Sequence, residues 1–116
     1  MNTVSIHPYF KPHEGQMAAF KELLPKFMEA TQSEEGCHFY EFTICDDIIF
    51  CREGYAGGEA ALTHLGNVDS LLKQGLEIAE LLRLEIHGAA AELDKLREPL
   101  KDLPVDWFVL ECGLEK

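Results

Sequence analysis

The sequence predicts a single α+β domain in which helices cover one face of an antiparallel sheet. The chain has 116 residues, an ordinary length for one domain, so its apolar residues have to share one core. Hydrophobic residues make up 47% and charged residues 27%, as in globular proteins. Segments with the two-residue repeat of strands alternate with segments of helical spacing. We therefore expect one domain over residues 1–116.

The first half of the chain predicts a strand, a helix and a hairpin. Residues 4–10 have strand character, and a turn with Pro and Gly follows them. Apolar residues then recur at helical spacing, namely Met17, Phe20, Leu24, Phe27, Met28 and Thr31. Residues 37–44 and 48–53 are rich in aromatic and β-branched residues, and Asp46-Asp47 joins them as a hairpin turn.

The second half predicts three helices and two strands. Residues 59–65 and 68–82 have helical spacing and are separated by a Gly-Asn break. Residues 82–87 alternate apolar and charged side chains, with Leu82, Leu84 and Ile86 on the apolar side. Residues 89–100 predict a helix and residues 105–111 a last strand.

The resulting order, β-α-β-β-α-α-β-α-β, contains two interlocked split βαβ units, which is the ferredoxin-like arrangement with strand order 4-1-3-2. Such a sheet has helices on only one face. The opposite face, with apolar residues from several strands, would be exposed on a monomer, and large exposed apolar patches usually mark a partner surface. We therefore expect a symmetric homodimer in which two sheets pair face to face as a dimeric α+β barrel.

The charge balance limits the classes of partner that the protein can bind. The chain has 10 Lys and Arg against 21 Asp and Glu, a formal net charge of -11, which disfavours nucleic acid and anionic membranes as partners. No basic-then-apolar leader is visible, so we expect a cytoplasmic protein.

The cysteines form no C-x-x-C pair and are expected to be buried thiols. No phosphate loop, nucleophile elbow or dinucleotide fingerprint points to a cofactor.

Three ordered motifs within residues 4–66 carry a family resemblance. They are Glu35-Gly36-Cys37 leading to Tyr40-Glu41-Phe42, then Cys51-Arg52-Glu53-Gly54-Tyr55, then Ala61-Leu62-Thr63-His64-Leu65. This pattern resembles the antibiotic biosynthesis monooxygenase superfamily of dimeric α+β barrels, in which a Gly-Cys opens the second strand, a Glu near the end of the third strand precedes an aromatic residue, and an Ala-x-x-His-Leu-like helix follows.

The resemblance implies a fold more firmly than an activity. Some members oxidise quinols or polyketide aromatics without metal or flavin, others degrade haem, and others have no known reaction. We expect no bound cofactor and a small aromatic ligand, with haem degradation as a third option. The chain departs from the pattern with Tyr55 where many members have Trp, and with an added helix and strand after His87. These departures suggest a separate branch of the superfamily.

His64, Glu53 and Tyr55 are the main candidates for chemistry. His64 corresponds to a histidine of the family, and an imidazole that titrates near neutrality could take a proton from a phenolic substrate. Glu53 and Tyr55 share one face of their strand, so they could converge with His64 at one end of the sheet. The alternative is a structural role, in which His64 packs locally and Glu53 bonds to backbone or to Arg83.

Further residues are expected to bind the substrate if His64 acts as the base. Tyr55, with Phe50 or Phe42, would shape the pocket, and Arg52 or Asn67 would stabilise developing negative charge. The rival hypothesis is a non-catalytic ligand-binding or structural module whose polar residues hold the dimer together. An enclosed cavity at His64 and Glu53 would favour chemistry, whereas mutually satisfied groups in a filled core would favour the structural role.

A second polar row is predicted on neighbouring strands. In the 4-1-3-2 order His7 and Tyr9 lie beside Arg83, Glu85 and His87. Two histidines and a carboxylate could bind a divalent metal, but no short-range ligand spacing supports one. We expect no metal, and a dimer contact or a solvated face instead.

Overall fold

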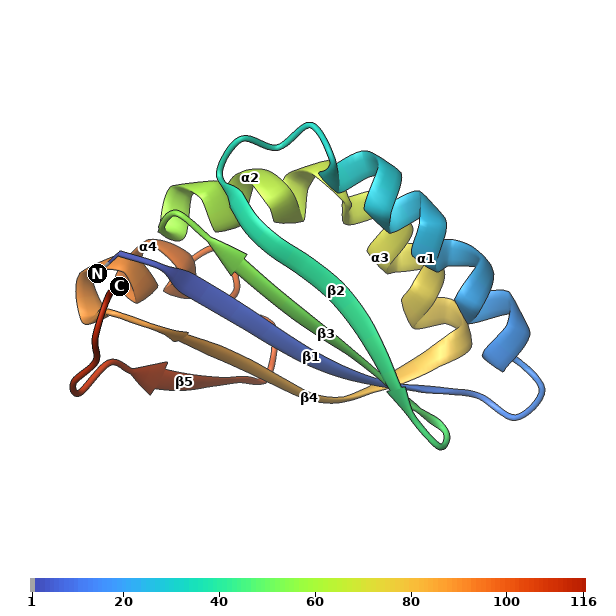
Figure 1. Ribbon diagram of the computed structural model, residues 1–116. Coiled ribbons are helices and arrows are strands. Elements are labelled where there is room, and N and C mark those ends of the chain that lie inside the picture. The colour runs from blue at the N-terminus through green and yellow to red at the C-terminus, as the bar shows by residue number, and fades with distance from the viewer. Residues whose placement is uncertain (1) are drawn as a thin grey trace.

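A five-stranded sheet with helices on one face organises the chain in this computed structural model, which describes residues 2–116 (Figure 1). The elements, in order, are β1 (Val4–Pro12), α1 (Met17–Thr31), β2 (Cys37–Cys45), β3 (Ile48–Tyr55), α2 (Gly58–Asn67), α3 (Asp69–Ile78), β4 (Ala79–Gly88), α4 (Ala90–Arg97) and β5 (Val105–Val109). Every predicted element is present, with boundaries that differ by a few residues.

The strand order is β2-β3-β1-β4-β5. It contains the predicted order of the first four strands, so the α+β, ferredoxin-like prediction is confirmed. β1 lies in the centre and pairs antiparallel with β3 and β4, while β5 adds a parallel strand at the edge beside β4. β2 and β3 form the predicted hairpin, in which Asp46 has a φ of 51° at the first turn position. Short polar residues tolerate that left-handed conformation.

The predicted boundary between the third helix and the fourth strand is wrong. α3 ends at Ile78, and β4 begins at Ala79 rather than at Leu82. The pairing of β1 with β4 shifts register between Tyr9 and Phe10, so that Leu82 is an extra residue of a β-bulge. The bulge reverses the alternation of the strand. Leu82 is therefore 46% exposed, contrary to prediction, and Leu81 packs against the core instead.

The core forms three clusters, which occupy two parts of the covered face of the sheet. Under α2 and α4 it contains Val4, Ile6, Tyr55, Ala61, Leu84, Ile86, Leu93 and Leu96. Under α1 and α3 it contains Phe10, Phe20, Leu23, Phe27, Ile49, Val68 and Ala79. Met28, predicted on the buried stripe of α1, is exposed, because Phe20, Leu23 and Phe27 define that stripe. The candidate site lies between the two parts.

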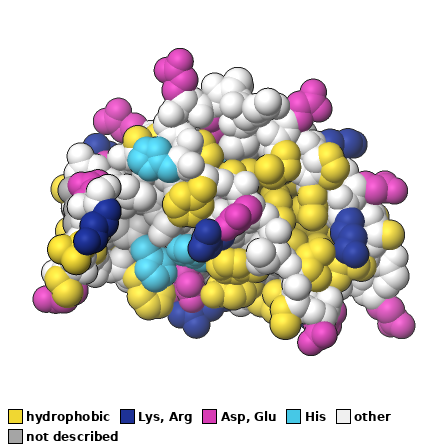
Figure 2. Space-filling model, in the orientation of Figure 1, with side chains coloured by type: hydrophobic (Ala, Val, Ile, Leu, Met, Phe, Trp, Pro, Cys, Tyr) yellow, Lys and Arg dark blue, Asp and Glu magenta, His cyan; other side chains and the backbone are white. Residues whose placement is uncertain are grey.

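The opposite face of the sheet is open and mixes aromatic, histidine and charged side chains (Figure 2). His7 and Tyr9 pair with Glu85 and Arg83 as predicted. Phe50 contacts His7 and Tyr9, with ring centroids 5.8 and 4.7 Å apart. Helices do not cover this row, which leaves it available to a partner.

The four cysteines are free thiols, but their predicted burial holds only in part. Cys51 is buried and Cys37 is half-buried, whereas Cys45 and Cys112 are exposed. Cys45 is the last residue of β2 and Cys112 follows β5, so both lie outside the core. Among residues 2–116, no helix is long and apolar enough to cross a bilayer.

Candidate functional site

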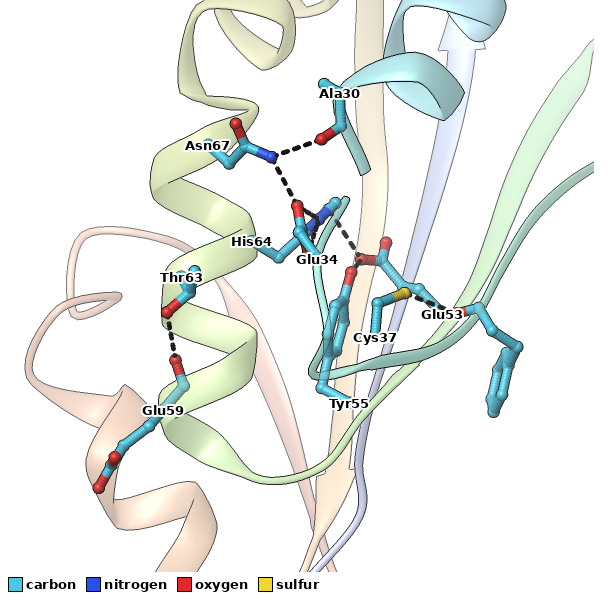
Figure 3. Close-up of polar contacts among 10 residues, drawn as sticks. Ala30, Glu34, Cys37, Glu53, Tyr55, Glu59, Thr63, His64 and Asn67 are labelled. Carbon is cyan, nitrogen blue, oxygen red and sulfur yellow. Dashed lines mark hydrogen bonds and ion pairs between the residues drawn. The ribbon is translucent and has the colours of Figure 1, made fainter. Parts of the chain in front are cut away.

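Four polar side chains meet in the interior beneath α2 (Figure 3). Glu53 and Tyr55 come from β3, His64 from α2, and Glu34 from the turn between α1 and β2. Glu53 and His64 are 4% and 2% exposed, and the side chain of Glu34 is 8% exposed. Asn67, at the end of α2, joins the group from the surface. The site therefore combines segments that are far apart in the sequence.

These side chains form one connected row. The Tyr55 hydroxyl donates a hydrogen bond to Glu53 Oε1, and the same oxygen lies 3.4 Å from His64 Nε2. On the other side of the ring, His64 Nδ1 lies 3.0 and 3.1 Å from the two carboxylate oxygens of Glu34. Asn67 Nδ2 donates to Glu34 Oε2 at 2.7 Å and to the Ala30 carbonyl at 2.7 Å. One imidazole thus bridges two carboxyl groups.

Local sequence explains why α2 approaches the turn so closely. Gly36 faces Ala60, and a Cβ on Gly36 would lie 2.6 Å from the Ala60 Cβ. Real Cβ atoms do not approach so closely, so a glycine is needed there. The Ala56 amide also donates to the Gly36 carbonyl at 2.8 Å. On α2, Ala61 and His64 share the buried side at helical spacing, which directs the imidazole inward.

Burial sets the ionisation of the two central groups. It raises the pKa of Glu53 to about 7, with hydrogen bonds from Tyr55 and Cys51 acting in the opposite direction. Burial also lowers the pKa of His64, which the neighbouring Glu34 partly restores. Desolvation disfavours the charged form in both cases. Near neutrality Glu53 can therefore hold or release a proton, which is the property that acid–base chemistry requires.

A narrow apolar cavity of about 90 Å³ adjoins Glu53 and His64. Tyr40, Phe42 and Cys51 lie near the carboxyl group, and Leu76 and Leu103 line the cavity as well. Leu76 and Leu103 are 43% and 42% exposed, so they form its outer rim. Burial raises the pKa of both Tyr40 and Cys51, which keeps these two groups protonated. Glu53, with its pKa raised to about 7, can therefore exchange a proton near neutrality at the cavity wall, with His64 beside it.

The structure brings together most of the predicted site residues. His64, Glu53, Tyr55 and Asn67 belong to the polar row, and Phe42 lines the cavity. In the alternative, structural role, Glu53 was expected to bond to Arg83. The Arg83 guanidinium lies on the open face instead, where it pairs with Glu85 and Asp106.

Two predicted substrate-binding residues are not in the cavity. Arg52 and Phe50 alternate with Glu53 on β3 and lie on the open face of the sheet. Arg52 pairs with Glu41 at 2.6 Å, and Phe50 stacks on His7. Arg52 and Phe50 therefore cannot contact a substrate beside His64, contrary to our expectation. On the open face, as elsewhere in residues 2–116, no group of His, Cys, Asp and Glu side chains has a metal-binding arrangement.

Sequence reasoning missed Glu34 as part of the site. This residue precedes the Glu35-Gly36-Cys37 motif and is separated from His64 by 30 positions. The tight packing of Gly36 on α2 brings the two together, and the motif itself is the only sequence signal of that contact. Tyr40 and Cys51 were also missed, although strand alternation places Cys51 on the same face as Glu53.

Comparisons with known proteins agree with this architecture. Residues 3–48 match the family model described as "Antibiotic biosynthesis monooxygenase". The crystal structure of MupZ from Pseudomonas fluorescens is 35% identical over 100% of this chain and 96% of that chain, with a TM-score of 0.94. Among curated proteins, none matches.

Two further solved structures share the fold over a smaller part of the chain. Rv0793 from Mycobacterium tuberculosis is 22% identical over 73% of this chain and 92% of that chain, with a TM-score of 0.65. SO0527 from Shewanella oneidensis is 20% identical over 73% of this chain and 88% of that chain, with a TM-score of 0.67. By contrast, the match to MupZ covers the whole chain and so includes α4 and β5.

The fold and the site define a ferredoxin-like α+β protein with a buried row of polar side chains beside an apolar cavity. The chain belongs to the antibiotic biosynthesis monooxygenase superfamily. Since MupZ shares its full length, the added helix and strand are features of this protein and MupZ alike.

Proposed function

We propose that this protein is a cofactor-independent monooxygenase-like enzyme that removes a proton from a small, largely apolar aromatic or quinol substrate. The observation that carries the proposal is a buried carboxyl, Glu53, whose pKa is raised to about 7 at the wall of an apolar cavity. His64 Nε2 lies 3.4 Å from the same carboxyl oxygen. Glu53 and His64 together act as the base, a refinement of the expectation that His64 acts alone.

The chemistry requires molecular oxygen as the second substrate. Loss of a proton from a phenol or from an adjacent activated CH₂ group gives an anion that donates electrons to O₂. In the overall reaction R₂CH₂ and O₂ give R₂C=O and H₂O, so one oxygen atom enters the product and the other leaves as water with the two hydrogens. The proton accepted by the Glu53–His64 pair is returned when that water forms.

The cavity supports a substrate that is only partly enclosed. Its volume of about 90 Å³ is well below the roughly 300–1,000 Å³ of most drug-sized ligand sites. A single ring or a reactive edge is therefore the part that reaches Glu53. Phe42 and Tyr40 supply aromatic contacts there, and the half-exposed Leu76 and Leu103 contact the remainder.

The test is oxygen uptake with a panel of simple quinols and phenols, measured on the wild type, Glu53→Gln and His64→Phe. His38→Ala is the matched control, because His38 is an exposed histidine on β2. We expect uptake by the wild type and the control, and a loss of about 10²–10⁴-fold in the two site variants. Uptake that is absent with every substrate, or equal in all four proteins, contradicts the proposal.

The second candidate is a non-catalytic ligand-binding module. It is favoured by one specific observation, namely that the polar groups of the row satisfy one another from Tyr55 through Glu53 and His64 to Glu34. A thermal-shift screen with the same compounds separates the two functions. Stabilisation that weakens in His64→Ala without oxygen uptake by the wild type indicates the binding module.

We also propose that two copies pair through the open face of the sheet as a homodimer. The face carries exposed Phe39 and Phe108 and the half-buried Phe50, and an uncovered apolar surface of this kind usually has a partner. Sedimentation of the wild type, Phe50→Asp and the helix-surface control Glu77→Lys tests this. We expect a dimer, a monomer and a dimer respectively, and a monomeric wild type contradicts it.

A further inference from the structure

Glu34 is the outer end of the buried row and lies next to the solvent. Its carboxylate contacts His64 on the inner side, and on the outer side it lines a surface groove of about 660 Å³. That groove also contains Glu29, Cys37 and Tyr40. Glu53, at the other nitrogen of the ring, lines the inner cavity. The imidazole of His64 thus separates a carboxylate near solvent from a carboxyl in the interior.

The geometry at His64 selects one tautomer. A carboxylate accepts hydrogen bonds, so both Glu34 oxygens, at 3.0 and 3.1 Å from Nδ1, require the proton to be on Nδ1. Nε2 then carries the lone pair and lies 3.4 Å from Glu53 Oε1, a contact that is favourable while the Glu53 carboxyl holds its proton. Asn67 donates to Glu34 Oε2 and so holds the carboxylate in place. A ring turned the other way would place a lone pair against the carboxylate.

We propose that Glu34 is a positioning residue that fixes the Nδ1–H tautomer of His64 and stabilises the protonated imidazole when Nε2 accepts a proton. In many enzymes the catalytic base is itself held in its working orientation by a third side chain. Here the third group is an acid that neither the family motifs nor the comparisons assign. The catalytic meaning rests on the proposed function, but the effect on His64 is a property of the free protein.

The other groups around the imidazole do not replace Glu34 in this role. Tyr40 of β2 and Tyr55 of β3 face the ring with centroids 4.9 and 5.0 Å away, and both keep their protons because burial raises their pKa values. Glu53 of β3 faces Nε2 and not Nδ1. Glu34 is therefore the carboxylate that acts on the Nδ1 side.

The test is ¹⁵N NMR of the His64 ring across pH, in the wild type, Glu34→Gln and Glu34→Asp. Glu29→Gln is the matched control, because Glu29 lines the same groove with an exposed side chain. An anion within hydrogen-bonding distance of an imidazole raises its pKa by about 1–3 units. We expect Glu34→Gln to lower the pKa of His64 by about one unit or more, a tenfold weaker protonation, and to reduce the Nδ1–H population.

Glu34→Asp keeps the charge, so partial recovery of the wild-type pKa separates the charge of Glu34 from its packing. Circular dichroism checks that each variant is folded. If Glu34→Gln leaves both the tautomer and the pKa of His64 as in the wild type, the inference is wrong. If the NMR result holds but no substrate consumes oxygen, the inference stands and the proposed monooxygenase function alone fails.

Discussion

Replacing Glu53 by Gln should change how the stability of the protein depends on pH. The pKa of Glu53 is 4.5 as an ordinary carboxyl and about 7 in the folded protein, because burial disfavours its ionised form. A raised pKa means that the protonated carboxyl favours the folded state. Its contribution is fully present below about pH 4.5 and is lost as the pH rises through about 7. Gln has nearly the same shape and no such titration.

The size of this effect follows from the two pKa values. A difference from 4.5 to about 7, at 1.36 kcal/mol for each unit, corresponds to about 3 kcal/mol. The free energy of unfolding of the wild type, relative to Glu53→Gln, should therefore fall by about that amount between acid and mildly alkaline pH. His64 acts in the opposite sense, because its lowered pKa costs stability as the pH falls, but it is present in both proteins.

Urea unfolding, followed by circular dichroism at a fixed protein concentration, measures this difference across the pH range. Glu80→Gln is the control, because Glu80 is an exposed carboxyl on β4. Its difference from the wild type should stay nearly flat. A Glu53→Gln difference that changes by less than about 1 kcal/mol over the range would refute the reasoning, because burial of the charged form would then carry no measurable cost.

Two further predictions concern the hydrogen bond to Glu53 and the packing beneath it. Tyr55→Phe removes a donor that lowers the pKa of Glu53, so the transition of the previous experiment should move to higher pH, with a loss of about 1–3 kcal/mol of stability. Gly36→Ala should cost about 1–3 kcal/mol in urea unfolding, because the new methyl group would meet Ala60. Gly66→Ala, in open space on α2, should be neutral or stabilise by about 0.5–1 kcal/mol, and equal costs at the two glycines would contradict the packing argument.

Sequence periodicity was sufficient to predict the sheet and the faces of its central strands. The alternation in β3 places Glu53 and Tyr55 on the face opposite to Arg52, and the split βαβ order places His7 beside Glu85. These are local or topological properties, which a two-residue repeat and short connections determine. The face on which each strand residue lies could therefore be predicted, whereas the expected roles of Arg52 and Phe50 beside His64 did not follow that alternation.

The errors have a common physical origin in tertiary contacts. The β-bulge at Leu82 depends on how β4 pairs with β1, and a single-residue shift moves a side chain to the other face. The role of Glu34 depends on the close approach of its turn to α2, which Gly36 permits. Neither the bulge nor the approach leaves a periodic signal in the segment concerned, so reasoning about one element at a time could not find them.

The same alternation that positions the site also separates it from the open face. On β3, Cys51, Glu53 and Tyr55 point to the helices, while Phe50 and Arg52 point away from them. Because the faces share a backbone but no side chains, substitutions on them should act independently. Variants of Glu53 should alter proton affinity without changing association, and variants of Phe50 should alter association first. A Phe50 variant that dissociates and also shifts the pKa of Glu53 would mean that pairing of two chains completes the buried site.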